Sequence, residues 1–203
     1  MRTNRLPDHP IEPIFLDRWS PRAFDAAPIP EADLRTIMEA GRWAPSAFNI
    51  QPWRFLYARH GDANWQAFLQ FLDPGNAAWA QNASALVVLL SDTVMPGDGD
   101  RPDLPSRTHS FDAGAAWTQL ALQATALGYQ AHAMAGLDFD AATRALEVPE
   151  RYRVEIAIAI GRRVDPATLP QELRDRESPS QRLPLHDIAF AGRYPRNKAA
   201  AAA

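Results

Sequence analysis

The sequence predicts an α+β fold in which a central sheet is covered by helices. Short, continuous apolar runs such as 84–91 and 152–161 are typical of buried strands. Longer segments such as 30–43 and 111–128 carry apolar residues at helical spacing. Because helices and strands alternate without a regular βαβ pattern, an α+β arrangement is favoured over a parallel α/β one.

The individual elements follow in chain order. A helix is predicted over 30–43, because Pro30 fits the first helical position and Leu34, Ile37 and Met38 recur at helical spacing. The same patterns predict helices over 62–72 and 140–148 and strands over 51–59, 84–91, 129–136 and 152–161. In the last strand, one face of the sheet is expected to hold Tyr152, Val154, Ile156, Ile158 and Ile160.

Three further segments bear on organisation. The helix over 111–128 is apolar on more than one face, which indicates burial at the domain centre or in an oligomer interface. The polar, Pro- and Gly-rich connection 92–108 indicates either disorder or an active-site lid, which would span 92–110. The tail 165–203 has few core residues, so we expect it to be an extended arm that docks on a second chain.

Composition sets the broad class. With 203 residues, 46% of them hydrophobic, the chain can form one domain over 1–203 or half of a larger joint one. A net charge of −3 gives no basic field for nucleic acid or an anionic membrane. The absence of Cys excludes disulfides, thiolate catalysis and Cys-ligated zinc. No apolar leader or membrane-length run is found, and a cytoplasmic protein is expected.

Common cofactor motifs are absent. The five His residues are scattered and form no HExxH pair, so no metal site is predicted. Neither GxGxxG nor GxxxxGK[ST] occurs, which argues against a Rossmann or P-loop nucleotide site.

Polar residues stand out in three separated segments. These are "RWSPR" with Arg18, Ser20 and Arg22, "PSAFNIQPW" with Ser46, Asn49 and Gln51, and "SQRLPL" with Arg182. Taken singly, the Arg residues are compatible with solvated surface charges, and the amides with loop capping. Together they suit flavin mononucleotide, FMN. Guanidinium groups match a phosphate and an anionic reduced ring, hydroxyls match the ribityl chain, and amides match the donor and acceptor edge of the ring.

The ordered set of segments resembles the nitroreductase family of flavin enzymes. The resemblance runs through "RWSPRAFD", "AGRWAPSAFNIQPWRF", "FDAGAAWTQLALQATALG", "AMAGLDFD", "IAIG" and "QRLPL", from about residue 14 to 190. It implies a mainly antiparallel sheet and an intertwined homodimer with flavin sites at the interface.

The resemblance also implies roles for individual residues. Arg18, Ser20 and Arg22 would hold the phosphate, the ribityl chain and the N1/O2 side of FMN, and Arg182 would reach the phosphate. Pro45, Ser46 and Asn49 would come from the other subunit, with Gln51 close by. The turn of Ala133, Ala135 and Gly136 would pass its backbone near N5.

The chain departs from the family pattern at several positions. Trp19, which we include in the cofactor-binding set, stands where the family often has a second basic residue, and Ser180 where a Lys is found. Arg162 and Arg163 either compensate for this loss of charge or are solvated charges at the end of a strand. At Ala135 the acidic residue of some members is missing, so only the backbone amide serves N5.

The function implied is reduction of nitroaromatic, quinone or related small acceptors by NADH or NADPH through FMN, in a ping-pong mechanism. The flavin would carry the chemistry, so no catalytic side chain is assigned. Two alternatives remain open: a flavin-cleaving or dehalogenating enzyme on the same scaffold, and a non-catalytic flavin-binding dimer.

Overall fold

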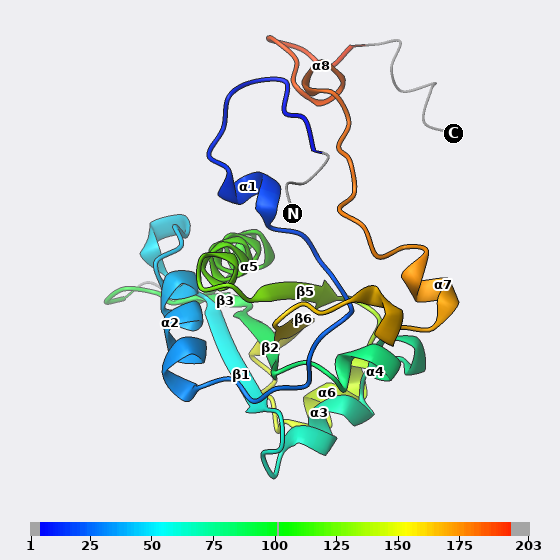
Figure 1. Cartoon of the computed structure of the whole chain (residues 1–203). Helices are drawn as coiled ribbons and strands as arrows, with labels where there is room; N and C mark the ends of the chain where they lie inside the picture. The colour runs from blue at the N-terminus through cyan, green and yellow to red at the C-terminus, as the bar shows by residue number, and fades with distance from the viewer. Residues whose placement is uncertain (1–4, 101, 196–203) are drawn as a thin grey trace.

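A four-stranded antiparallel sheet lies at the centre of the molecule (Figure 1). Residues 5–100 and 102–195 are described by a computed structural model. The strands run in the order β1-β2-β6-β5, with β1 at Trp53–Arg59, β2 at Ala85–Asp92, β5 at Gln130–Met134 and β6 at Tyr152–Gly161. All neighbouring strands pair antiparallel, which confirms the predicted α+β class.

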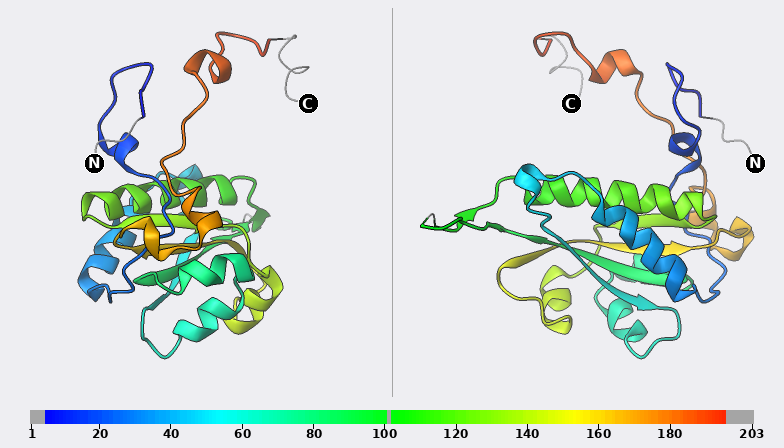
Figure 2. Two further views of the ribbon diagram at one scale, coloured as in Figure 1. Left: turned by 45° about the vertical axis from the view of Figure 1, so that its right-hand side comes forward. Right: turned by 90° about the vertical axis from the view of Figure 1, so that its left-hand side faces the viewer.

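Helices cover both faces of this sheet (Figures 1 and 2). One face carries α2 at Glu31–Arg42 and α5 at His109–Ala126, and the other carries α3 at Trp65–Gln70, α4 at Pro74–Ala80 and α6 at Phe139–Ala145. The sequence favours α2 locally, because Glu31 and Asp33 lie in its first turn and Arg42 in its last. The helices thus form two layers, one on each face of the sheet.

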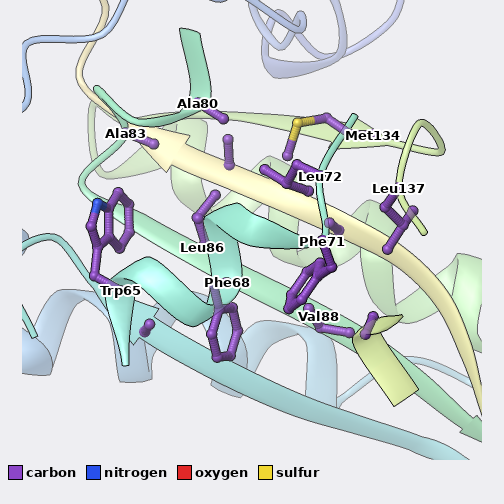
Figure 3. Close-up of a cluster of buried hydrophobic side chains, with 14 of the residues drawn as sticks. Trp65, Phe68, Phe71, Leu72, Ala80, Ala83, Leu86, Val88, Met134 and Leu137 are labelled. Carbon is purple, nitrogen blue, oxygen red and sulfur yellow. The ribbon is translucent and has the colours of Figure 1, made fainter. Parts of the chain in front are cut away.

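Two clusters of buried side chains hold these layers to the sheet. Figure 3 shows the cluster under α3 and α4, which includes Trp65, Phe68, Phe71, Leu72, Leu86, Val88 and Met134. The cluster under α2 and α5 includes Leu34, Ile37, Val87, Leu89, Leu120, Ile158 and Ile160. Strand β2 is buried along its whole length, because its alternate residues feed the two clusters.

A β-bulge in β6 overturns one prediction. Leu89 pairs with Ile156 and Leu90 pairs with Val154, so Glu155 is an extra residue in the ladder. The side chains therefore change face at this point. Tyr152 and Val154 pack in the cluster under α3 and α4, whereas Ile156, Ile158 and Ile160 pack under α5. The prediction of one shared face was wrong because a period of two assumes an unbroken register.

The connection over 92–108 contains a short hairpin. Strand β3 at Val94–Met95 pairs with β4 at Leu104–Pro105, and Ser106 N donates to Thr93 O at 2.8 Å. The hairpin projects from the end of the sheet (Figure 2, right). Its role as an active-site lid stays a prediction.

The two terminal segments leave the body together (Figures 1 and 2). The first contains α1 at Ile14–Asp17, and the second contains α7 at Gln171–Arg174 and α8 at Leu185–Ile188. Between them lies a groove of about 340 Å³ with exposed apolar walls, among them Leu6, Ile11, Phe15, Leu183, Leu185 and Ile188. The end of the predicted arm, 196–203, lies outside the described residues. In the described chain, each helix is too short or too polar to span a bilayer.

Candidate functional site

Three guanidinium groups gather where the terminal segments leave the body. Arg5 donates from Nε to Ser180 O at 3.0 Å and from Nη1 to Leu16 O at 3.0 Å and Arg18 O at 2.7 Å. Arg5 therefore ties the segment before α1 to the segment that carries Arg182. Arg18 and Arg182, two residues singled out in the sequence, are brought together in this way. Arg5 was missed, because one Arg in an irregular N-terminal stretch gives no sequence signal.

Within the described part of the chain, the charges of this cluster are not balanced by acids. Among residues 5–100 and 102–195, no salt bridge joins Arg5, Arg18 or Arg182 to a carboxylate. Burial lowers the pKa of Arg18, and the positive charge of Arg182 lowers it further. The pKa of Arg5 is lowered in the same way by burial, Arg182 and Arg18. Three mutually repelling cations form a site that an anion with several acceptor oxygens would stabilise.

The segment between Arg18 and Arg22 is held by a half-buried histidine, His132. His132 of β5 contacts Pro21 O through Nδ1 at 2.9 Å, and its ring lies 4.7 Å from the ring of Trp79. Burial lowers the pKa of His132 to about 4, the Pro21 carbonyl opposes this shift, and the positive charges of Arg22 and Arg18 add to the lowering. The neutral ring then carries its proton on Nδ1, since a carbonyl can only accept. His132 therefore fixes the backbone next to Ser20, whose hydroxyl lies 3.4 Å from Arg18 Nη1.

This histidine predicts a loss of stability in mild acid. The folded-state pKa of about 4 lies below the ordinary value of 6.5, so between these values the unfolded chain binds the proton that the folded chain excludes. The contribution of neutral His132 to the free energy of unfolding is fully present above pH 6.5. It is lost as the pH drops toward 4, and the full loss is about 3 kcal/mol. Urea unfolding of the wild type and of His132→Gln at pH 7.5 and 4.5 measures this. The pH dependence should be smaller in the variant, and equal dependence would contradict the assignment.

Arg22 is paired with an acid that the sequence did not reveal. Its backbone N donates to Glu177 Oε1 at 2.6 Å, and Ala23 N donates to the same oxygen at 3.0 Å. Arg22 Nη1 lies 3.6 Å from Glu177 Oε2. The segment after α7 is thereby attached to the segment that carries Arg18, Ser20 and Arg22.

The loop 45–51 has an unusual backbone. Phe48, Asn49 and Gln51 have φ values of 52°, 55° and 50°, in the left-handed region that non-glycine residues rarely adopt. Ser46 Oγ accepts from Gln51 N at 3.0 Å, and Gln51 Nε2 donates to Asn49 O at 3.1 Å. The side chain of Phe48 is 88% exposed. Strain of this kind, together with an exposed aromatic ring, is typical of a segment shaped for binding.

This loop lies far from the Arg cluster within one chain. Ala47 N donates to the buried Asp112 Oδ2, in the first turn of α5, at 3.2 Å. Trp19 N donates to Gln130 Oε1, beyond the other end of α5, at 3.3 Å. The helix has 18 residues, which separates its ends by about 27 Å. Figure 2 (right) shows the loop in cyan beside one end of α5 and α1 in dark blue beside the other.

The turn after β5 is closely packed on the start of α4. Gly136 O accepts from Asp73 N at 3.1 Å and from Asn76 Nδ2 at 2.9 Å. A Cβ at Gly136 would lie 2.6 Å from both Asn76 Nδ2 and Asp73 Oδ2, so a larger residue here would displace these two side chains. Ala135 is exposed, and Ala133 and Gly136 are half-buried.

The remaining candidates have other environments. Trp19 is only 5% exposed and packs inside the protein. Arg162 lies 4.3 Å above the ring of Tyr129, and Arg163 lies 5.8 Å above that of Trp19. The third guanidinium of the cluster is thus Arg5. Pro45 is exposed at the start of the left-handed loop.

Comparison with known proteins assigns the family. The family model described as "Nitroreductase family" matches residues 16–162. The chain therefore belongs to the nitroreductase family, an oxidoreductase family, which confirms the resemblance seen in the sequence.

Individual relatives extend this match. A crystal structure of an oxidoreductase containing FMN superposes with a TM-score of 0.92 at 48% identity, covering 95% of this chain and 97% of the other. An uncharacterized 15.4 kDa protein of Mycolicibacterium smegmatis is 34% identical over 150 residues, 70% of this chain and 97% of that protein. The NADH dehydrogenase of Thermus thermophilus is 28% identical over 202 residues, covering 86% of this chain and 92% of that protein.

Proposed function

We propose that two copies of this chain bind FMN between them and use NADH or NADPH to reduce small acceptors such as nitroaromatics and quinones. The observation that carries the proposal is the group of Arg5, Arg18 and Arg182 with no acidic partner among the described residues. A phosphate dianion supplies the missing negative charge and accepts several charge-assisted hydrogen bonds. A relative at 48% identity contains FMN, and one at 28% identity is an NADH dehydrogenase.

The other residues fit the rest of the cofactor. Ser20 and Arg22 lie two and four residues after Arg18 and would serve the ribityl chain and the N1/O2 side. The backbone of the turn at Ala133, Ala135 and Gly136 would serve N5. FMN, when bound, supplies the hydride and electron chemistry, while this chain binds, orients and shields the reacting groups. Reductant and acceptor would occupy the same place in turn, which is a ping-pong mechanism.

A second copy of the chain would complete the site. Within one chain, the loop with Pro45, Ser46, Asn49 and Gln51 lies about 27 Å along α5 from the Arg cluster, so one chain does not combine the two sets. A two-fold dimer is the commonest way for a partner to supply the loop. The exposed apolar walls of the groove between the terminal segments also favour an occupant, and a second copy is the one we propose.

Two measurements test the function. Cofactor released by heat from the purified protein should run as FMN on chromatography; FAD or no flavin would contradict the proposal. The flavin-loaded protein should oxidise NADH or NADPH with turnover when a quinone or nitrofurazone is present. Flavin binding without turnover would instead identify a carrier. Arg18→Ala is the matched variant, because its FMN affinity and its turnover at a limiting FMN concentration should fall together.

A further inference from the structure

Glu177 follows α7, and its side chain packs against residues 18–22, which carry Arg18, Ser20 and Arg22 and are called the flavin segment here. Its side chain is 1% exposed, although its neighbours in sequence, Arg176 and Ser178, are exposed. One oxygen, Oε1, accepts from the backbone of both Arg22 and Ala23 at 2.6 and 3.0 Å. These two bonds fix the backbone from which the Arg22 side chain projects.

The second oxygen of Glu177 has a different environment. Oε2 is buried and receives no hydrogen bond from the described residues, and the Arg22 guanidinium lies 3.6 Å from it. A buried carboxylate is costly unless a cation compensates it. Because Oε2 is inaccessible, neither solvent nor a ligand reaches it without rearrangement, so Arg22 is the group that compensates this charge.

We infer that Glu177 is a positioning residue that holds Arg22 in place and offsets part of its charge. The inference rests on the proposed function, in which Arg22 faces the N1/O2 side of the flavin. Two consequences follow. Arg22 is ordered before the cofactor binds, which lowers the cost of binding. Arg22 also stabilises the anionic reduced flavin less than an unpaired guanidinium would, because a carboxylate lies on its other side.

Two variants separate these consequences. Glu177→Gln keeps an oxygen that can accept from Arg22 N and Ala23 N but removes the charge. Glu177→Asp keeps the charge but shortens the reach to both N–H groups. Glu172→Gln is the matched control, because it removes the same charge from an exposed position in the preceding helix α7.

The measurements are FMN titration of the apoprotein and the midpoint potential of the bound flavin. In Glu177→Gln, the affinity for reduced relative to oxidised FMN should rise about tenfold, which for two electrons is about 30 mV more positive. In Glu177→Asp, the potential should stay near that of the wild type, while oxidised FMN binds about tenfold more weakly. Glu172→Gln should change neither quantity.

The outcomes are distinct. An unchanged or more negative potential in flavin-loaded Glu177→Gln would overturn the inference and leave the flavin assignment standing. If Glu177→Gln does not fold, Glu177→Asp decides: a shifted potential, or unaltered FMN affinity, overturns the inference. Wild-type apoprotein that binds no FMN would instead reject the proposed function itself.

Discussion

Refolding an equal mixture of Arg18→Glu and Asn49→Asp chains is expected to restore about a quarter of wild-type activity. Each variant alone should be inactive, because a carboxylate at 18 repels the phosphate and Asp at 49 loses the amide donor. If Arg18 and Asn49 of different chains form each site, a heterodimer collects both defects in one site and leaves the other intact. About half of the dimers are then heterodimers, each with one working site.

The choice of residues matters for this experiment. Arg18 is used instead of Arg22 because a new carboxylate at 22 would face the buried Glu177 and disturb folding. Asp at 49 tolerates the left-handed backbone, where φ is 55°. As a control, Arg18→Glu mixed with Arg182→Glu should restore nothing, because both changes fall in the same half of the site. An inactive, verified heterodimer of the first pair would reject the shared site.

Trp79→Ala is expected to lower the free energy of unfolding by about 3–5 kcal/mol, the usual cost of removing a large buried ring. Trp79 is 2% exposed, and its ring lies 6.2 Å from Phe24 and 4.7 Å from His132. The cavity would also remove the support of His132, which fixes Pro21 in the flavin segment. Urea unfolding and FMN titration should therefore both respond.

Trp79→Phe serves as the graded control, because it keeps a ring against His132. It should cost clearly less than Trp79→Ala and retain most of the FMN affinity. A decrease in the free energy of unfolding of less than about 1 kcal/mol in Trp79→Ala would contradict this expectation. It would show that the side chains around position 79 fill the space left by the ring.

Local patterns were sufficient to predict most of the architecture. Pro30 and the helical spacing after it predict α2, and the continuous apolar run over 84–91 predicts β2. The error at β6 has a physical cause. Glu155 is an inserted residue, and nothing in an alternating run distinguishes an insertion from a regular position.

The site was predicted only where side-chain chemistry gathers in short segments. Arg18, Ser20 and Arg22 stand together in the sequence, as do Ser46, Asn49 and Gln51. Arg5, His132 and Glu177 stand alone, and tertiary packing brings them to this site from distant segments. Single residues without a motif carry no signal until the fold is known.

The most direct test of the account is the preference of the apoprotein for FMN over riboflavin, which differ by the phosphate. If Arg5, Arg18 and Arg182 bind that phosphate, FMN should bind about a hundredfold tighter or more, because each charge-assisted bond contributes about 1.5–3 kcal/mol. Arg18→Ala and Arg182→Ala should each reduce the preference about tenfold and leave riboflavin binding unchanged. Equal affinity of the wild type for the two flavins would contradict the account.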